Sequence, residues 1–211
     1  MSFVNKNSDT PQMTASKRIT ARIEEQPPAW VFTPSDFLDL GSPHTVGMAL
    51  NRMLRAGGIR RLARGLYDRP KLHPKLGPLA PTPDAIARAI ARRDGIRVQP
   101  AGAAAANLLR LSEQVPARVV YETDGRSRIV RVGRQTIEFR NTTRRNPETI
   151  GKTSGIVIAA LRNIGKANVT EPRVAHLRDL LSAEDRERLL QDLPRAPAWM
   201  HRYLRFVAAE K

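Results

Sequence analysis

The segment TPSDFLDLGSPHTVGMALNRMLRAGG, residues 33–58, uses one helix-starting pattern twice. In Thr33-Pro34 and again in Ser42-Pro43, a hydroxyl residue is followed directly by proline. A hydroxyl at the N-cap accepts a hydrogen bond from an unpaired backbone N–H, and proline at the first helical position loses no bond because that N–H would have no partner. The pattern therefore predicts a short helix over about 34–39 and a second helix over about 43–56.

The connection between these two predicted helices is short. Only Leu40, Gly41 and Ser42 separate them, which is the spacing of a helix-turn-helix with glycine in the turn. An earlier helix is predicted over about 14–26, because its apolar residues share one face and Pro27-Pro28 ends it.

The second predicted helix has two different faces. At 100° per residue, Val46, Ala49 and Leu50 fall in one apolar stripe with Met53 and Leu54. The opposite face carries donors, acceptors and cations suited to base edges and phosphates. The residues of this segment that we expect to contact DNA are Ser42, His44, Thr45, Met48, Asn51, Arg52 and Arg55.

The next residues, GGIRRLARGLYDRP at 57–70, interleave apolar residues with arginines. We predict a two-stranded hairpin that turns at Ala63-Arg64-Gly65, with a bulge or short strands because its alternation is imperfect. Its apolar residues would anchor it on the helices. The hairpin residues expected at the DNA backbone or in a minor groove are Arg60, Arg61 and Arg64.

These elements together predict a winged helix-turn-helix domain over 14–75. The alternative is a small helical domain with a basic face that is merely solvated. Basic residues are concentrated here: residues 42–75 hold eight Arg and Lys against Asp68 alone.

The remaining chain predicts a second region. Residues 1–13 are expected to be a disordered tail, and residues 70–82, with four prolines, a linker. Residues 76–211 are expected to form a mixed α/β domain with a small sheet and several helices, so the whole chain is of the α+β class. We expect helices over about 83–93, 101–112, 147–164, 171–181, 183–191 and 197–209, one strand in 96–100, and three strands in 117–143.

Composition restricts the function classes. The chain has 211 residues and a net charge of +16, which attracts polyanions. No apolar run approaches the roughly 20 residues of a membrane span, and the N-terminus has no apolar signal-peptide segment. We therefore expect a cytoplasmic protein without a membrane partner. The absence of cysteine excludes disulfides, thiolate zinc sites and a cysteine nucleophile, and the scattered histidines predict no metal site.

The segment Gly151-Lys152-Thr153 matches the end of a phosphate-binding P-loop. The full pattern requires glycine at position 146, where this chain has Asn146. Thr149 or Thr153 as a helix cap is the simpler interpretation. We therefore predict no cofactor, no catalytic residue and no enzymatic activity, with a nucleotide-using kinase or nucleotidyltransferase as the alternative.

A second basic block covers residues 126–145, where seven arginines face Glu138 alone. Three interpretations stay open for it: a solvent-exposed sheet face, a second nucleic-acid contact, or a surface for an acidic partner.

The chain also resembles a known family. Residues 31–70, VFTPSDFLDLGSPHTVGMALNRMLRAGGIRRLARGLYDRP, resemble the N-terminal winged-helix region of AbiEi-type antitoxins, with most of the likeness in ALNRMLRAGGIRRLARGLY, residues 49–67. The stretch from VQPAGAAAANLLRLSEQVPARVVYETDG to APAWMHRYLRF resembles the remainder of a subgroup of these proteins.

The resemblance implies a transcriptional autorepressor that binds double-stranded promoter DNA. It also implies that residues 76–211 form an antitoxin domain against a nucleotidyltransferase-like toxin encoded beside it, in an abortive-infection toxin–antitoxin system. A plasmid- or RNA-binding accessory protein without a toxin is a further alternative. The operator sequence and the oligomeric state are left open.

Overall fold

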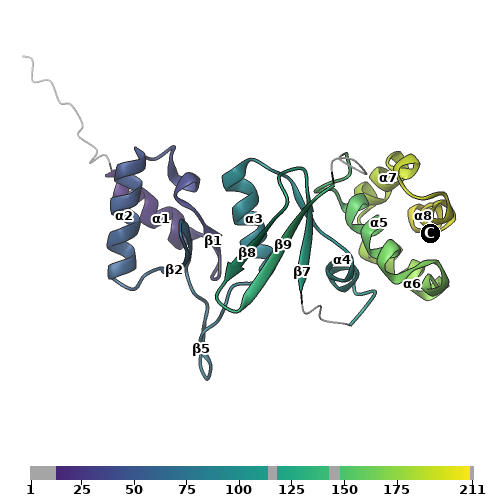
Figure 1. Ribbon diagram of the computed structural model, residues 1–211, viewed down its shortest axis with the longest axis horizontal. Helices are drawn as coiled ribbons and strands as arrows, with labels where there is room; N and C mark the ends of the chain where they lie inside the picture. The colour runs from purple at the N-terminus through teal and green to yellow at the C-terminus, as the bar shows by residue number, and fades with distance from the viewer. Residues whose placement is uncertain (1–12, 114–117, 143–147, 210–211) are drawn as a thin grey trace, which may run out of the picture. The chain divides into compact units, whose positions relative to one another are not determined.

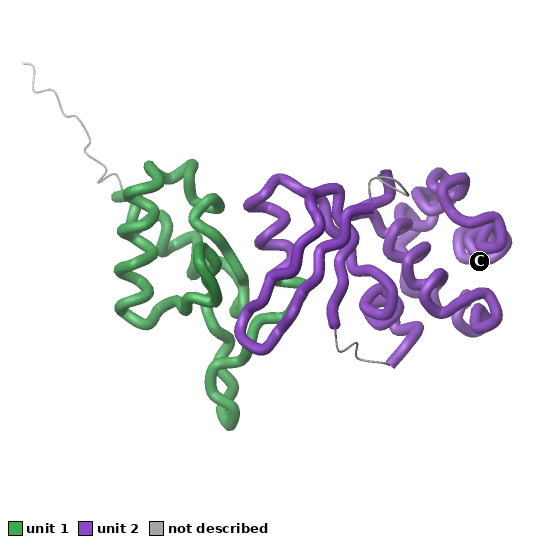
Figure 2. The backbone as a smooth tube through the Cα atoms, viewed as in Figure 1, with its two compact units in different colours: residues 1–85 green, residues 86–211 purple. Residues whose placement is uncertain are grey.

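The computed structural model describes residues 13–113, 118–142 and 148–209. The chain is a mixed α+β protein, 50% helix and 18% strand, and it divides into two compact units, residues 1–85 and 86–211 (Figure 2). Most of the tail predicted over 1–13 lies outside the described residues.

The helices of unit 1 begin where the sequence predicts. They are α1 (Ala15–Glu25) and α2 (Pro43–Arg55), with a 3-10 helix (Pro34–Phe37) between them. The Ser42 hydroxyl accepts a hydrogen bond from the Thr45 N–H at 3.2 Å, which confirms its role as the N-cap of α2. The predicted helix 34–39 is only one 3-10 turn, because the chain turns at Gly41, whose backbone packs closely against α1 and α2.

Three short strands form the sheet of unit 1 in the order β1-β3-β2. They are β1 (Val31–Phe32), β2 (Arg60–Ala63) and β3 (Leu66–Asp68). The register between β2 and β3 shifts between Arg61 and Ala63, which confirms the predicted irregularity. Gly65 adopts φ +69° in the turn, a conformation that favours glycine. The sequence analysis missed β1, which is antiparallel to β3.

The core of unit 1 lies between its helices and this sheet. Phe32 and Phe37 meet edge to face, and Trp30 stacks on Phe32. The buried residues of this core are Ile19, Ile23, Phe32, Phe37, Leu40, Val46, Ala49, Leu50 and Ile59. The predicted apolar stripe of α2 and the apolar face of α1 therefore share one core.

The prediction of a linker over 70–82 was wrong. This stretch contains a second hairpin, formed by β4 (Leu72–His73) and β5 (Gly77–Pro78), which extends away from the helices of unit 1 (Figure 1). The four prolines do not prevent it, because the ladder needs only two pairs of residues.

Unit 2 contains a four-stranded sheet in the order β6-β7-β9-β8. Its strands are β6 (Val98–Pro100), β7 (Val119–Thr123), β8 (Arg128–Val132) and β9 (Gln135–Asn141). The β7–β9 pair is parallel and the other two pairs are antiparallel. The predicted strand in 96–100 and the three predicted strands in 117–143 are therefore confirmed. The helix α3 (Pro83–Asp94) precedes the sheet, and the Thr82 hydroxyl accepts from the Ala85 N–H.

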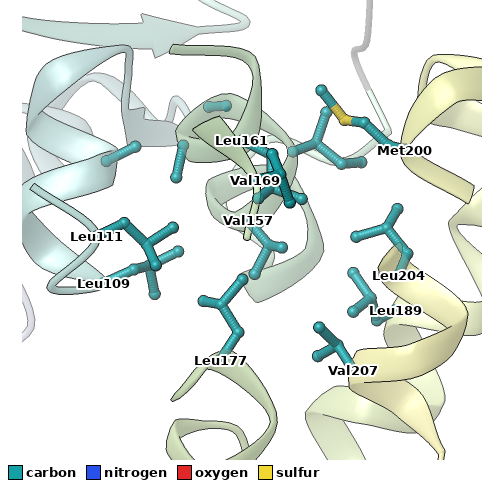
Figure 3. Packing of buried hydrophobic residues seen from close by; sticks show 14 of the residues in the cluster. Leu109, Leu111, Val157, Leu161, Val169, Leu177, Leu189, Met200, Leu204 and Val207 are labelled. Atoms are coloured by element: carbon teal, nitrogen blue, oxygen red, sulfur yellow. The ribbon is translucent and has the colours of Figure 1, made fainter. Parts of the chain in front are cut away.

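The other helices of unit 2 pack around α5 (Figure 3). They are α4 (Ala103–Leu108), α5 (Thr153–Ile164), α6 (Glu171–Leu180), α7 (Ala183–Gln191) and α8 (His201–Ala208), with 3-10 turns at Lys166–Asn168, Leu193–Arg195 and Ala198–Met200. The core includes Val157 and Leu161 of α5, Leu177 of α6 and Leu204 of α8.

One helix start in unit 2 was predicted wrongly. A helix was expected from residue 147, but α5 begins at Thr153. Residue 147 lies outside the described part of the chain, and residues 148–152 form a turn in which Gly151 has φ +82°. A left-handed glycine interrupts a helix, so the helical pattern of this stretch begins only after it.

Candidate nucleic-acid interface

The outward face of α2 is solvent-exposed along its length. Val46 and Leu50 are at most 1% exposed, whereas Met48, on the opposite side, is 54% exposed. The exposed side chains of this face are His44, Met48, Asn51, Arg52 and Arg55. The predicted division of α2 into two faces is therefore confirmed, while its contact with DNA stays a prediction.

Ser42 and Thr45 contribute differently from the rest of this face. Their hydroxyls lie 3.0 Å apart and share a hydrogen bond, and Ser42 also caps the helix. Both side chains thus fix the start of α2. Thr45 is only partly exposed on the flank, as the helical wheel predicts.

The cations around α2 have no acidic neighbours in sequence, because residues 40–67 contain neither Asp nor Glu. Arg52, Arg55, Arg61 and Arg64 are exposed, and their side chains form no hydrogen bond or ion pair with any described residue. Two of them lie on α2, one lies on β2, and Arg64 lies in the turn after β2. We call these four residues the free arginine set.

Arg60 differs from Arg61 and Arg64, with which the sequence analysis grouped it. Its Nε and Nη2 donate to the two carboxylate oxygens of Asp68 at 3.0 and 2.7 Å. The Asp68 side chain is completely buried. This hydrogen bond raises the pKa of Arg60 above its ordinary value, against the opposing effect of desolvation.

Arg60 therefore stabilises the hairpin through Asp68, and it is not part of the free arginine set. Its Nη2 also donates to the Leu79 carbonyl at 2.8 Å. The sequence held a signal for this pairing, because Arg60 and Asp68 are equally distant from Arg64, the centre of the predicted turn. Cross-strand neighbours of opposite charge are a common way to stabilise a hairpin.

Two further arginines of unit 1 also bind carbonyl or carboxylate oxygens of the protein. The sequence analysis assigned neither of them a role. Arg69 donates from Nη1 to the Glu24 carbonyl at 3.0 Å and from Nη2 to the Gln26 carbonyl, so it binds the C-terminal end of α1. Arg22 forms a bidentate pair with Asp39, at 2.8 and 2.7 Å. The hydrogen bond from Arg22 lowers the pKa of Asp39.

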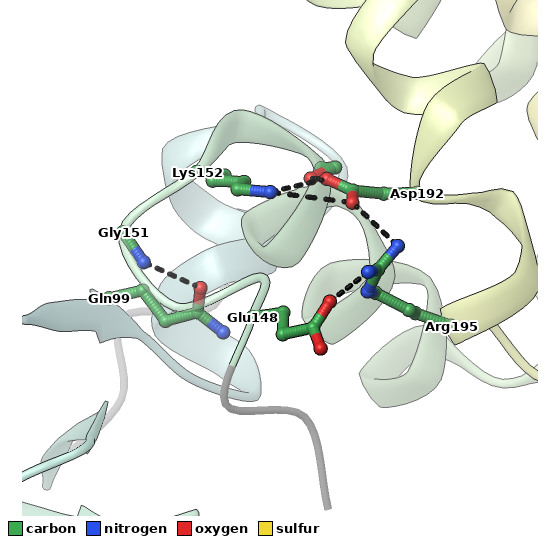
Figure 4. Close-up of polar contacts among 7 residues, drawn as sticks. Gln99, Glu148, Gly151, Lys152, Asp192 and Arg195 are labelled. Carbon is green, nitrogen blue, oxygen red and sulfur yellow. Dashed lines mark hydrogen bonds and ion pairs between the residues drawn. The ribbon is translucent and has the colours of Figure 1, made fainter. Parts of the chain in front are cut away.

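The Gly151-Lys152-Thr153 loop of unit 2 is held by the protein itself (Figure 4). The Lys152 ammonium lies 3.4 Å from both carboxylate oxygens of Asp192, which also accepts a hydrogen bond from Ser154 at 2.6 Å. The Gly151 N–H donates to Gln99 at 3.2 Å.

Neither predicted cap of α5 is present in the described structure, where Lys152 is the N-cap residue and makes no side-chain cap bond. The Thr153 hydroxyl instead binds Asp185, and this bond, with a further one from Ser182, lowers the pKa of Asp185. Position 146 lies outside the described residues.

The second basic block, residues 126–145, also contains both paired arginines and arginines without a described partner. Arg128 pairs with Asp94 at the end of α3 and lies 5.3 Å from the centre of the Phe139 ring, and Arg140 pairs with Glu138 at 2.9 Å. Three arginines are exposed and have no partner among the described residues: Arg126, Arg131 and Arg134. Arg144 and Arg145 lie outside the described residues.

Unit 2 also contains a cleft of about 630 Å³ at the carboxyl ends of the parallel strands β7 and β9. It is lined by Ala101, Gly102, Glu122, Arg140, Asn141, Thr142, Ala159, Arg162 and Asn163. Of its charged groups, Glu122 binds Gln99 at 2.7 Å and Arg140 binds Glu138. The cleft therefore combines both signs of charge.

In the described part of the chain, no three His, Asp or Glu side chains gather as metal ligands. No helix there is both long enough and apolar enough to pass through a lipid bilayer.

Comparisons with known proteins give one family. The model of a family of unknown function, DUF6088, matches residues 18–189. A search of curated proteins finds no match. A solved structure similar to the chain is that of the RV2827C protein from Mycobacterium tuberculosis, at 18% sequence identity and a TM-score of 0.44, covering 92% of this chain and 75% of that one.

Proposed function

Since the chain belongs to DUF6088, a family of unknown function, we propose its role from its own geometry: unit 1 is a winged helix-turn-helix domain that binds double-stranded promoter DNA. In this proposal α2 enters the major groove and the β2–β3 hairpin is the wing. The order of elements supports it, since a 3-10 helix and α2, joined by a tight turn, are followed directly by a hairpin.

The observation that carries the proposal is the free arginine set. Four guanidinium groups on α2, on β2 and in the turn that follows it have no partner among the residues that the structure describes, and the stretch from 40 to 67 contains no acidic residue. A phosphate contact from each would contribute favourably to affinity through counterion release. Asn51 and Arg52 also have the donors and acceptors that read adenine and guanine edges in the major groove.

We assign unit 2 the antitoxin role, against a nucleotidyltransferase-like toxin encoded beside this chain. The resemblance to AbiEi-type antitoxins supports this, as does a core that belongs to unit 2 alone. Leu180, Leu190 and Phe206 on its last three helices are exposed apolar side chains that a protein partner could cover. The whole chain would then be a cytoplasmic autorepressor and antitoxin.

A nucleotide-using enzyme is the weaker candidate. A P-loop lysine must reach the phosphates of its ligand, whereas the Lys152 ammonium pairs with Asp192. No described contact favours a plasmid- or RNA-binding accessory role over promoter binding.

The first experiment measures affinity for duplexes of 40 base pairs from the region upstream of the chain's own gene. Arg52→Ala should cost about 1–3 kcal/mol of binding if Arg52 reads a guanine. The matched control is Arg205→Ala, which removes the same charge from an exposed position in unit 2. Equal losses for Arg52→Ala, Arg55→Ala and the control would contradict the assigned face.

The second experiment separates the two roles in cells with the full chain. The R52A/R55A variant should release a promoter reporter and still protect cells that express the neighbouring toxin. Loss of protection together with repression would show that protection depends on DNA binding, and would contradict the assignment of the antitoxin role to unit 2.

A further inference from the structure

Residues 71–79, the segment we call the arm, expose two leucines on a purely basic hairpin. Leu72 and Leu76 are each 72% exposed, more than any other large apolar side chain in the described ranges. Lys71 and Lys75 lie beside them in sequence, and residues 69–83 contain no Asp or Glu. Leucines exposed beside cations suit a ligand that is anionic and also able to cover leucine.

The arm has a defined local structure. Leu72 pairs with Pro78 and His73 with Gly77, and the Leu79 N–H donates to the Lys71 carbonyl at 2.9 Å. At the tip, the His73 Nδ1 accepts from the N–H groups of Lys75 and Leu76, both at 3.2 Å. These bonds fix the arm locally, so its leucines are presented on an ordered hairpin.

The base of the arm is attached to the sheet of unit 1. The Arg60 guanidinium that binds the buried Asp68 also donates to the Leu79 carbonyl, at the end of the arm. Arg60 begins β2 and follows the end of α2 by five residues, so the base of the arm lies at the α2 end of the β2–β3 ladder. The Arg64-Gly65 turn lies at the opposite end of that ladder, next to the Ala63–Leu66 pair.

We propose that the arm is a second DNA contact, which places Leu72 and Leu76 in the minor groove while Lys71 and Lys75 bind the flanking phosphates. Proteins that bind the minor groove insert apolar side chains between base steps and bend the duplex. Charge favours this occupant, because the arm shares unit 1 with the free arginine set and carries no acidic group. The inference rests on the proposed function of unit 1.

The test uses the full chain and the 40-base-pair upstream duplex, labelled at both ends for energy transfer. L72S/L76S should weaken binding on the order of tenfold and restore a straighter duplex, with an unchanged salt slope. K71A/K75A should reduce the magnitude of the salt slope by roughly 2, about 0.9 for each phosphate contact. The matched control L108S/I129S removes two exposed apolar side chains from unit 2 and should leave affinity, bend and salt slope unchanged.

The outcomes separate this inference from the proposed function. If the wild-type chain binds no duplex, the proposed function of unit 1 fails. If it binds and both arm variants equal wild type in affinity, bend and salt slope, only the arm proposal is overturned. If L72S/L76S changes the sedimentation coefficient of the chain without DNA, or abolishes binding to vesicles of anionic phospholipid while the bend persists, the arm is a self-interface or a membrane contact and the proposal is wrong.

Discussion

The surface around α2 was predicted to bind DNA, and the loop before α5 matches only the end of a phosphate-binding pattern; their cations are arranged in opposite ways. Around α2, Arg52 and Arg55 have no partner among the described residues. Before α5, the Lys152 ammonium lies against Asp192, which also binds Arg195 and Ser154. A cation that already neutralises a nearly buried carboxylate stabilises the fold, whereas an unpaired, exposed one remains available to a ligand.

The same contrast occurs within a single hairpin. Arg60 and Arg61 are neighbours in β2, yet Arg60 binds the buried Asp68 and Arg61 is exposed without a partner in the described structure. Density of positive charge therefore does not identify a binding surface by itself. The position of each carboxylate decides which arginines are available.

The largest effect is expected from replacing Arg60, the arginine of β2 that binds Asp68. Arg60→Ala leaves Asp68 buried without a partner, which should lower the free energy of unfolding of unit 1 by about 3 kcal/mol. Arg61→Ala should change this free energy of unfolding by less than about 0.5 kcal/mol, because Arg61 is exposed and has no partner among the described residues. The fluorescence of Trp30 in urea reports this unfolding once Trp199 is replaced by Phe. Similar losses of unfolding free energy for Arg60→Ala and Arg61→Ala would contradict the distinction between the two arginines.

A somewhat smaller effect is expected in the α5 loop. Asp192→Ala removes the acceptor of Lys152, Ser154 and Arg195, and should destabilise unit 2 by about 2–3 kcal/mol. Trp199 fluorescence in a Trp30→Phe background measures this, and Glu187→Ala at an exposed position of α7 is the control. If Mg-ATP instead raises the melting temperature of the wild-type chain by several degrees, Lys152 is available to phosphate and the comparison fails.

The smallest effect concerns acid stability. The hydrogen bond from Arg93, with a further one from Arg128, lowers the pKa of Asp94 in the folded chain. Because the folded pKa is below the unfolded value of about 3.9, this contribution is present above pH 4 and is lost as the pH falls through the folded value. Asp94→Asn should therefore flatten the dependence of stability on pH below about pH 4. An unchanged curve would mean that this pair contributes nothing to folding.

Local patterns in the sequence predicted the elements that depend on local chemistry. Ser42 and Thr82 start helices because their hydroxyls can satisfy N–H groups three residues away, and the strands around Gly133 follow from alternation and turn residues. The strand β1 was missed because two residues carry no period, and its pairing with β3 joins segments 35 residues apart.

The candidate site was predictable to a similar degree. The outward face of α2 follows from helical periodicity, so Asn51, Arg52 and Arg55 were placed correctly on it. The role of Arg60 was missed because it depends on Asp68 being buried, and burial is a property of the packed core. The arm was missed because the prolines in 70–82 favour a linker by their number, although they occupy positions that a short hairpin tolerates.

The central claim, that the free arginine set is the DNA-binding surface, is tested most directly by the salt dependence of affinity for the upstream duplex. The variant R52A/R55A/R61A/R64A should reduce the magnitude of the slope of log K against log salt by roughly 3 to 4. The charge-matched variant R126A/R131A/R134A/R162A, changed at exposed positions of unit 2, should leave the slope unchanged. Equal reductions in the two variants would contradict the account, because binding would then follow net charge rather than the surface around α2.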